Sequence, residues 1–241
     1  MGITIAAIKY VQSLRIKKFR QKYHHFVVEG DKSVQELLAS DWSVFAWYHT
    51  RDFSAASMPE NGMLVSDKEM ERMSHHQAPQ HALAIVEIPE WTESLPTKGV
   101  HLYLDGIRDP GNLGTIIRIA DWYGLNELWC SPDTAEVYNP KCIDACMGSF
   151  LRVKVLVEEA EPFLRACTLP FYASVMDGEN IHSARLPKDA VLIIGNEGKG
   201  IQGTVLDLVK NRVSIPRLGG AESLNAGVAT AVLLDNFFRQ H

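Results

Sequence analysis

Short, uninterrupted apolar runs in the second half of the chain constrain its fold more than any other feature. Residues 190–195 (AVLIIG) are apolar along their whole length. Such a strand buries both faces, which is typical of a parallel sheet covered by helices on each side. Further strands are predicted at 101–107, 127–130, 152–156, 171–176 and 212–216, and helices between them at 112–124, 139–148, 159–168 and 223–240. This alternation predicts a doubly wound α/β domain.

The first half of the chain predicts a smaller α/β domain. Strands are predicted at 25–30, 43–50, 63–66 and 82–88, and helices at 33–40 and 66–76. Ser66 and Glu69 have the spacing of a capping box at the start of the second helix. A polar stretch with prolines follows at about 89–99. We therefore expect a small domain at 1–93, a linker at 94–99 and the larger domain at 100–241.

Composition excludes several classes of protein. The 241 residues carry 24 basic and 29 acidic side chains, so the formal charge of −5 argues against a generally basic nucleic-acid binder. No segment approaches the roughly 18 apolar residues of a membrane span, and the first residues lack the pattern of a signal peptide. The four cysteines form no CxxC pair. We expect reduced thiols, no membrane association and a cytoplasmic location.

Charge is nevertheless concentrated near the start of the chain. Residues 1–28 contain six basic side chains and no acidic one, and five of the six fall within eight residues. These five are Arg15, Lys17, Lys18, Arg20 and Lys22. Such a cluster can neutralise several phosphates, which makes it a candidate RNA-binding segment. A solvated helix face would produce the same pattern.

Three polar loops are candidates for a ligand site, because open α/β sheets bind ligands beyond the carboxyl ends of their strands. They are residues 105–118, 195–200 (GNEGKG) and 216–225. The chain has neither a GxGxxG after its first strand nor a GxxxxGK[ST], which argues against the common dinucleotide and triphosphate sites. Taken alone, GNEGKG is equally consistent with a tight turn.

The histidines and cysteines do not predict a metal site. The pairs His24–His25 and His75–His76 are adjacent in sequence, so we expect each pair to point in divergent directions. Cys142 and Cys146 lie one helical turn apart without a second pair. We therefore expect no bound metal.

The three loops together resemble a known family. The patterns are D-x-x-x-DP-x-N-x-G-x-x-x-R-x-A-x-x-x-G from Asp105 to Gly124, then IIGNEGxG, then IPxxGxxxSLN. In this order they look like the three motifs of the SpoU/TrmH RNA ribose 2′-O-methyltransferases. Residues 138–155 are also similar to that family, although Cys146 stands near its usual Ser or Ala. The segment FVVEGDKSVQELL at 26–38 is similar to a ribosomal-protein-like RNA-binding domain found in many members.

The resemblance implies a trefoil-knotted α/β domain that binds S-adenosylmethionine and forms a homodimer, with the active site near the dimer interface. It implies methyl transfer to a ribose 2′-hydroxyl of structured RNA, and the two-domain layout favours rRNA over tRNA. Two alternatives remain beside a tRNA substrate. One is an RNA-binding or ribosome-assembly protein of the same fold without catalysis, and the other is a small-molecule enzyme that uses GNEGKG for a phosphate.

The resemblance also assigns the site residues. The implied catalytic residues are Asn112, Arg118, Glu197, Ser223 and Asn225, with Arg118 central. The implied cofactor-binding residues are Ile194, Gly195, Asn196, Gly198, Gly200, Ile215, Leu218, Gly219, Ser223 and Leu224. Several also have a purely structural explanation: Asn112 and Ser223 as helix N-caps, and Arg118 as a surface partner of Asp121. Since arginine has a pKa above about 12, the general base stays unassigned.

Overall fold

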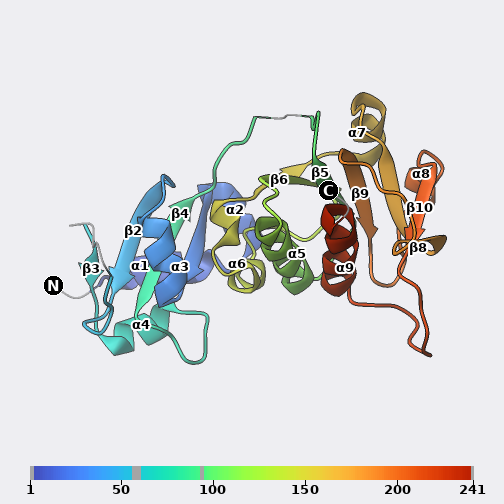
Figure 1. The fold of residues 1–241 in the computed structure, drawn as a ribbon. Coiled ribbons are helices and arrows are strands. Elements are labelled where there is room, and N and C mark those ends of the chain that lie inside the picture. The colour runs from blue at the N-terminus through green and yellow to red at the C-terminus, as the bar shows by residue number, and fades with distance from the viewer. Residues whose placement is uncertain (1–2, 56–60, 93–94, 240–241) are drawn as a thin grey trace. The chain divides into compact units, whose positions relative to one another are not determined.

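The computed structural model describes residues 3–55, 61–92 and 95–239 (Figure 1). It contains two compact units, formed by Met1–Glu90 with Tyr138–Leu151 and by Trp91–Val137 with Arg152–His241. Residues 93 and 94, at the junction between the expected small domain and the expected linker, lie outside the described residues. The linker at 94–99 therefore stays a prediction.

The first unit is built on a four-stranded sheet in the order β1-β4-β2-β3. Strand β4 is antiparallel to both β1 and β2, while β3 is parallel to β2. The elements of this unit are α1 (Ile5–Ser13), α2 (Lys17–Tyr23), β1 (His25–Glu29), α3 (Asp31–Leu38), β2 (Val44–His49), β3 (Met63–Leu64), α4 (Asp67–Met73), β4 (Ala82–Glu87), α6 (Pro140–Cys146) and the 3-10 helix η1 (Ser149–Leu151). The predicted capping box of α4 is confirmed, because Ser66 and Glu69 bond each other's backbone.

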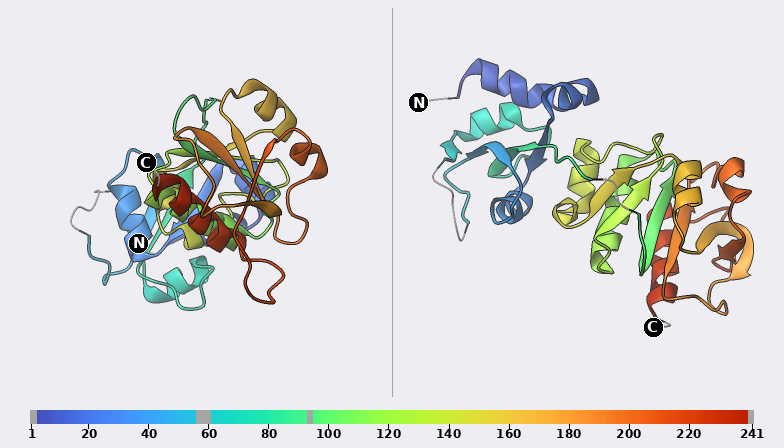
Figure 2. Two further views of the ribbon diagram at one scale, coloured as in Figure 1. Left: turned by 45° about the vertical axis from the view of Figure 1, so that its right-hand side comes forward. Right: turned by 90° about the horizontal axis from the view of Figure 1, so that it is seen from above.

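Helices cover both faces of this sheet (Figure 2). Alternate residues of a strand point to opposite faces. Val27 and Ile85 accordingly pack in one core cluster with Ile8 of α1 and Met70 of α4. The residues that alternate with these along β1 and β4 point to the other face, where α3 and α6 lie against β1. The small α/β domain expected from the sequence is present.

Residues 138–151 pack within the first unit although they follow α5 in the chain. The ring of Phe26 on β1 lies 4.6 Å from that of Tyr138 and 5.8 Å from that of Phe150, measured between centroids. The indole nitrogen of Trp42 donates to the carbonyl oxygen of Leu151 at 3.3 Å. A segment expected in the larger domain thus completes the core of the smaller unit.

The second unit contains a six-stranded sheet in the order β10-β8-β9-β5-β6-β7, with every pair parallel. Its elements are β5 (Val100–Asp105), α5 (Pro110–Trp122), β6 (Glu127–Cys130), β7 (Lys154–Val157), α7 (Ala160–Ala166), β8 (Phe171–Asn180), β9 (Ala190–Gly195), α8 (Gly203–Leu206), β10 (Asn211–Ser214) and α9 (Ala226–Arg239). This confirms the predicted parallel α/β fold. The trefoil knot stays a prediction, because strand order does not specify how the chain is threaded.

Two pairs of helices sandwich this sheet. Phe163 of α7 and Val205 of α8 share a core cluster with Tyr103 and Trp129 of the sheet. Helix α9 packs against α5 and against β9. All four cysteines are free and buried, and burial raises the pKa of the Cys130 thiol. Among the described residues, no helix has both the length and the apolar content needed to cross a bilayer.

Candidate active site

Two of the three polar loops follow neighbouring strands of the sheet. Strands β5 and β9 are paired in parallel along their length, with Asp105 opposite Gly195 at their ends. The loop after β5 leads into α5 and the loop after β9 contains Glu197, whereas the loop after β10 leads into α9. Parallel pairing therefore brings the first two loops to one edge of the sheet, as the sequence predicts.

The start of α5 differs from the sequence expectation. The helix begins at Pro110, and the side chain of Asp109 caps it by accepting a hydrogen bond from the amide of Asn112 at 2.9 Å. Asn112 is therefore not the N-cap. A proline at the first helical position has no amide hydrogen to satisfy, so the helix can start two residues earlier. The side chain of Asn112 is thereby left available for other contacts.

Asn112 connects the other two loops. Its Nδ2 donates to Oε1 of Glu197 at 2.5 Å, and its Oδ1 accepts from Nδ2 of Asn225 at 2.8 Å. These bonds join one residue from each of the three loops into a chain that we call the Glu197–Asn112–Asn225 relay. Because the bond to Glu197 uses the amide nitrogen and the bond from Asn225 uses the amide oxygen, the relay fixes the orientation of the Asn112 amide.

Asn225 also caps α9. Its Oδ1 accepts from the amide of Gly227 at 2.9 Å and from that of Val228 at 3.3 Å. The expectation that Ser223 caps this helix is wrong, because the helix begins at Ala226 and Ser223 lies three residues before it, exposed. An N-cap must immediately precede the first helical residue for its side chain to reach the free amides.

Polar side chains anchor the loop that carries Glu197. Asn196 donates from Nδ2 to the carbonyl oxygen of Gly106 at 2.8 Å, and its Oδ1 accepts from the amides of Gly198 and Lys199 at 3.0 Å. Asp105, for which the sequence predicts no role, is buried and accepts two hydrogen bonds from Gln202. The backbone amide of Gln202 donates at 2.6 Å and its side-chain amide at 2.8 Å. The place of Asp105 at the head of the first motif was the available signal.

The chain matches a known protein family. The family model described as SpoU rRNA Methylase family matches residues 99–235, which is more than half of the chain. The chain belongs to the SpoU rRNA methylase family. A second model, the MRM3-like substrate binding domain, matches residues 6–84.

Relatives resemble the chain over nearly its whole length. The 23S rRNA (guanosine(2553)-2′-O)-methyltransferase RlmP of Bacillus subtilis is 30% identical over 94% of each chain. A solved structure assigned to the TrmH family, from Porphyromonas gingivalis, has a TM-score of 0.89 at 31% identity and covers both chains completely. An AdoMet-bound rRNA methyltransferase from Sinorhizobium meliloti has a TM-score of 0.87 at 26% identity, over 100% of this chain and 97% of that one.

The loops that family resemblance connects with S-adenosylmethionine have features that fit a ligand of this kind. An ideal Cβ on Gly195 would lie 2.4 Å from backbone atoms of Gly200 and Ile201, so this tight turn requires glycine. Between residues 216 and 224, the described backbone amides make no hydrogen bond to another backbone group. In the same segment, Leu218 is fully exposed and Leu224 is half exposed. Free amides next to uncovered apolar side chains suit a ligand with both polar and aromatic parts.

The remaining cofactor candidates lie along the same loops. Ile194 is buried at the end of β9, and Ile215 is partly buried just after β10. Gly198, Gly200 and Gly219 are exposed. An added Cβ would meet nothing within 4 Å at Gly200 or at Gly219. The backbone at these two glycines is therefore open to a ligand from outside.

Arg118 lies apart from Asn112 on α5. The two residues are six positions apart, so a helix of 3.6 residues per turn places them on different faces. Arg118 is exposed on the face that also carries Thr115 and Trp122. The carboxylate of Asp121, one turn further along α5, accepts hydrogen bonds from Arg152 at 2.8 to 3.0 Å.

The five basic residues near the start of the chain divide into two groups. Lys17, Lys18 and Lys22 are exposed on α2. Arg20 is only 1% exposed, and its guanidinium donates to the carbonyl oxygens of Leu14 and Arg15 at 2.8 Å. The structure thus gives Arg20 a position inside the fold, because its side chain ties α2 to the end of the preceding turn.

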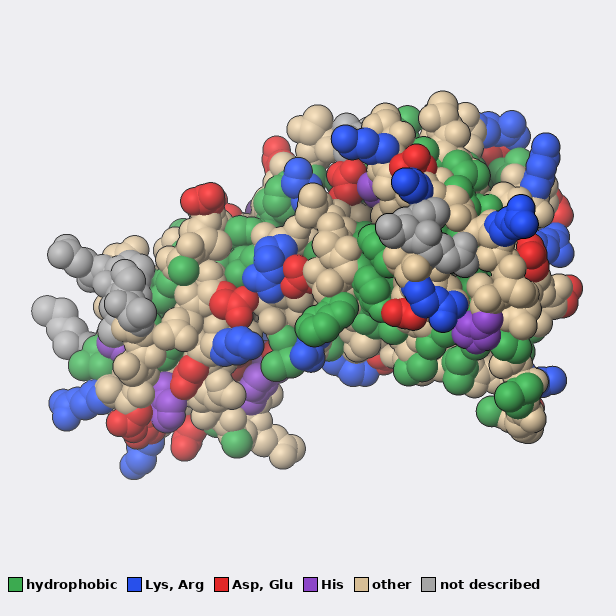
Figure 3. Space-filling model, in the orientation of Figure 1, with side chains coloured by type: hydrophobic (Ala, Val, Ile, Leu, Met, Phe, Trp, Pro, Cys, Tyr) green, Lys and Arg blue, Asp and Glu red, His purple; other side chains and the backbone are tan. Residues whose placement is uncertain are grey.

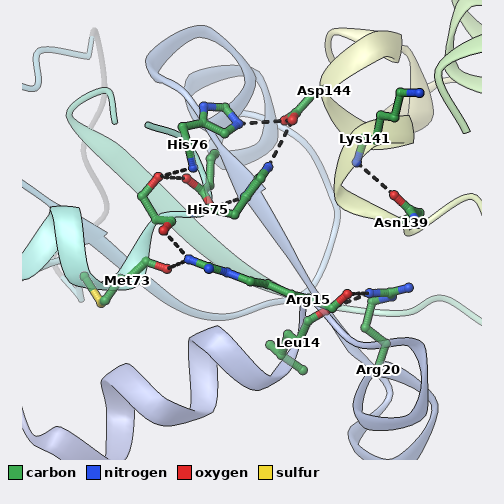
Figure 4. A network of polar contacts seen from close by, with 11 residues as sticks. Leu14, Arg15, Arg20, Met73, His75, His76, Asn139, Lys141 and Asp144 are labelled. Atoms are coloured by element: carbon green, nitrogen blue, oxygen red, sulfur yellow. Dashed lines mark hydrogen bonds and ion pairs between the residues drawn. The ribbon is translucent and has the colours of Figure 1, made fainter. Parts of the chain in front are cut away.

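Arg15 also has a structural contact. Its guanidinium donates to the carbonyl oxygens of Met73 and Ser74 at the end of α4 (Figure 4). Helix ends leave carbonyl groups unsatisfied, and a basic side chain is a suitable donor for them. The exposed lysines are therefore the part of the basic segment that is free to meet a phosphate backbone.

An aromatic cluster close to α2 was not identified from the sequence. Phe45 is 57% exposed, and its ring lies 4.4 Å from that of His25 and 6.3 Å from that of Tyr10. Tyr10 in turn contacts Tyr23, whose ring lies under the ammonium group of Lys22. These residues come from α1, α2, β1 and β2, so no local pattern in the sequence could have revealed the cluster.

Proposed function

We propose that the protein is an S-adenosylmethionine-dependent methyltransferase that acts on a ribose 2′-hydroxyl of large-subunit ribosomal RNA. The observation that carries this proposal is the Glu197–Asn112–Asn225 relay, which joins the three family motifs at one edge of the sheet. The named activity of the Bacillus subtilis relative, which is matched over 94% of its length, supports the same substrate class.

Residues 194–200 and 215–224 would hold the cofactor, mainly through their backbone. Bound S-adenosylmethionine supplies an activated methyl group on a sulfonium, so the protein's own task is to position the acceptor and manage one proton. Gly195 and the anchored side chain of Asn196 keep the first loop in place. Leu218 and Leu224 offer apolar cover for an adenine ring.

The relay would orient the acceptor hydroxyl. A carboxylate has about four lone-pair positions, so Glu197 can accept from Asn112 and still accept a hydrogen bond from a ribose hydroxyl. A hydroxyl that donates to a carboxylate is a better nucleophile because its proton is shared. Arg118 would bind a neighbouring phosphate and stabilise developing negative charge on the 2′-oxygen, since its guanidinium stays charged at neutral pH.

We also propose that the chain forms a homodimer through α5 and α9. Trp122 of α5 is 85% exposed, and Val228 and Phe238 of α9 are 51% and 39% exposed. Figure 3 shows hydrophobic side chains at the surface over these helices. Exposed apolar side chains on two packed helices are typical of an interface. Because Arg118 occupies the exposed face of α5 with Trp122, we infer that it acts in the partner's site.

The first unit would bind the RNA. Lys17, Lys18 and Lys22 supply positive charge for the phosphate backbone, and exposed Phe45 supplies a surface on which an unpaired base can stack. Phosphate contacts position an RNA without specifying its sequence, so the two kinds of contact have separate roles. The four buried thiols suit a reducing compartment, and we propose the cytoplasm as the place of action.

The test is methyl transfer from radiolabelled S-adenosylmethionine to unmodified 23S rRNA, 16S rRNA and tRNA, assayed separately. We expect label in 23S rRNA and protection of the adjacent phosphodiester from alkali, because a 2′-O-methyl group blocks attack by the 2′-oxygen. Label in tRNA alone would show that the substrate is tRNA and not 23S rRNA. RNA binding with neither transfer nor cofactor binding, also in ribosome-assembly intermediates, would favour a non-catalytic assembly protein.

A further inference from the structure

A polar cluster in the first unit shares no residue with the candidate active site. His75 and His76 follow the end of α4, and Asp144 lies on α6 (Figure 4). Glu29 is the last residue of β1. Glu29, His75 and His76 each offer an atom that can bind a metal ion, and these three atoms lie within 4.8 Å of one another. Asp144 adds a fourth such group.

One carboxylate oxygen of Asp144 contacts both histidines. Oδ2 of Asp144 lies 3.0 Å from Nε2 of His75 and 3.1 Å from Nε2 of His76. The two imidazole rings stand at 80° to each other with their centroids 4.2 Å apart. The sequence expectation that adjacent histidines diverge is wrong for this pair, because Nε2 of each ring contacts the same oxygen of Asp144.

Glu29 has a different position in the cluster. Its side chain is 5% exposed and it accepts hydrogen bonds from the hydroxyl of Ser74 and the amide of His75. Its Oε1 also contacts Nδ1 of His75 too closely for both atoms to bind one ion. A proton on Nδ1 that points to Glu29 leaves Nε2 of His75 as the ligand atom. A carboxylate behind a ligating histidine is a usual arrangement in metal sites.

We propose that Nε2 of His75, Nε2 of His76 and Oδ2 of Asp144 form a binding site for a divalent transition-metal ion of the Zn²⁺ type. Bonds of about 2.0 to 2.1 Å in a tetrahedral site separate ligand atoms by about 3.3 Å, and the Oδ2–Nε2 distances of 3.0 and 3.1 Å are close to this value. Binding also requires the two imidazoles to turn their Nε2 atoms toward a common ion. Two imidazoles and one carboxylate favour Zn²⁺, Co²⁺ or Ni²⁺ over Mg²⁺ and Ca²⁺.

The position of the site gives the ion a structural role. His75 and His76 lie in the chain before β4, whereas Asp144 lies on α6, 68 residues further on. The ion would cross-link these two segments of the first unit. The ligand side chains are 19%, 30% and 35% exposed, which leaves the ion accessible from solvent and a fourth position open to water. This proposal does not depend on the proposed methyl transfer.

A proton is the competing occupant. Burial by itself lowers the pKa of His75, but its hydrogen bonds to Asp144 and Glu29 outweigh burial and raise the pKa to about 9. Without an ion, a charged His75 can donate to both carboxylates. The experiment must therefore distinguish an ion from a bridging proton.

The test is titration of the chelator-treated full-length protein with Co²⁺, followed by visible absorption and calorimetry. We expect one Co²⁺ per chain with the intense visible bands of tetrahedral cobalt, and loss of these bands when Zn²⁺ displaces it. His76→Ala and Asp144→Asn should each weaken binding by about 100-fold or more, and Glu29→Gln by about 10- to 100-fold. His24→Asn, at an exposed histidine outside the cluster, should bind like the wild type.

Thermal unfolding supplies a second readout. Zn²⁺ should raise the Tm of the wild type and of His24→Asn, because an ion that binds only the folded state stabilises it, but not that of Asp144→Asn. Absence of saturable Co²⁺ binding would overturn the proposal and leave the bridging proton. Equal Co²⁺ affinity in the wild type and Asp144→Asn, with both folded, would also overturn it.

Discussion

At the scale of single residues, the candidate site depends on the orientation of one amide. Asn112 donates to Glu197 through Nδ2 and accepts from Asn225 through Oδ1. An asparagine can satisfy both neighbours at once, whereas an aspartate at the same position would place two carboxylates 2.5 Å apart. The relay therefore depends on the amide itself as well as on the size of the side chain.

We predict that Asn112→Asp destabilises the fold increasingly as pH rises. Repulsion between the two carboxylates raises the pKa of the pair in the folded state above its unfolded value, so stability is lost as pH increases through the folded pKa. The Tm difference from the wild type should grow between about pH 5 and pH 8. Asn112→Ala is the control and should show a difference that hardly changes with pH. A constant difference for both variants would contradict the relay.

A second prediction at this scale concerns Arg118. Arg118→Ala should lower kcat by roughly 10³-fold or more, because it removes stabilisation of charge that develops in the transition state. The Kd for S-adenosylmethionine should stay within about twofold, since Arg118 is not among the residues proposed to hold the cofactor. Arg165→Ala, at an exposed arginine paired with Glu161 on α7, is the matched control. Full activity of Arg118→Ala would refute its role.

At the scale of elements, α2 shows how one helix can combine binding and structural residues. Its lysines Lys17, Lys18 and Lys22 face solvent, whereas Arg20 lies inside the unit and bonds two carbonyl groups. A basic run in a sequence contains no information on which of its members points inwards. The packing of α2 against the rest of the unit decides which basic side chains point inwards and which face solvent.

We predict opposite phenotypes for the two groups of α2. Replacing Lys17, Lys18 and Lys22 with Gln should weaken RNA binding and reduce the slope of log K against log salt by about 2 to 3, because fewer counterions are released. The free energy of unfolding of this triple variant should hardly change. Arg20→Met should lower the free energy of unfolding by about 1 to 3 kcal/mol, because buried carbonyls lose their donors. Urea unfolding and RNA titrations check both, and an unchanged salt slope would remove α2 from the RNA-binding surface.

At the scale of the whole molecule, the proposed homodimer makes each active site a product of two chains. Arg118 shares the exposed face of α5 with Trp122, while Asn112 lies on another face and belongs to its own chain's relay. A complete site would then need the relay of one protomer and the arginine of its partner.

Mixed dimers test this arrangement. A heterodimer of Arg118→Ala and Asn112→Ala, purified with two different tags, keeps one complete site if the arginine acts across the interface. We expect about half of the wild-type rate per dimer, although each parent homodimer is inactive. A heterodimer of Arg118→Ala with the double variant has no complete site and is the control. An inactive mixed dimer would place Arg118 in its own chain's site.

The sequence by itself determined the parallel α/β fold, the capping box of α4 and the order of the three motifs. These features follow from local apolar periodicity and from short spacings, which a chain displays without being folded. Helix starts were less well predicted, because Asp109 and Asn225 were available as caps beside Asn112 and Ser223. The choice between neighbouring caps depends on where each helix packs.

Only the tertiary structure decided which distant side chains meet. The register of β5 and β9 brings Glu197 to Asn112, 85 residues away in sequence. The packing of α6 in the first unit brings Asp144 to His75 and His76. Local patterns do not contain such pairings, because strand register and helix packing depend on the whole core. The relay, the inward-facing Arg20 and the proposed metal site are therefore properties of the folded chain.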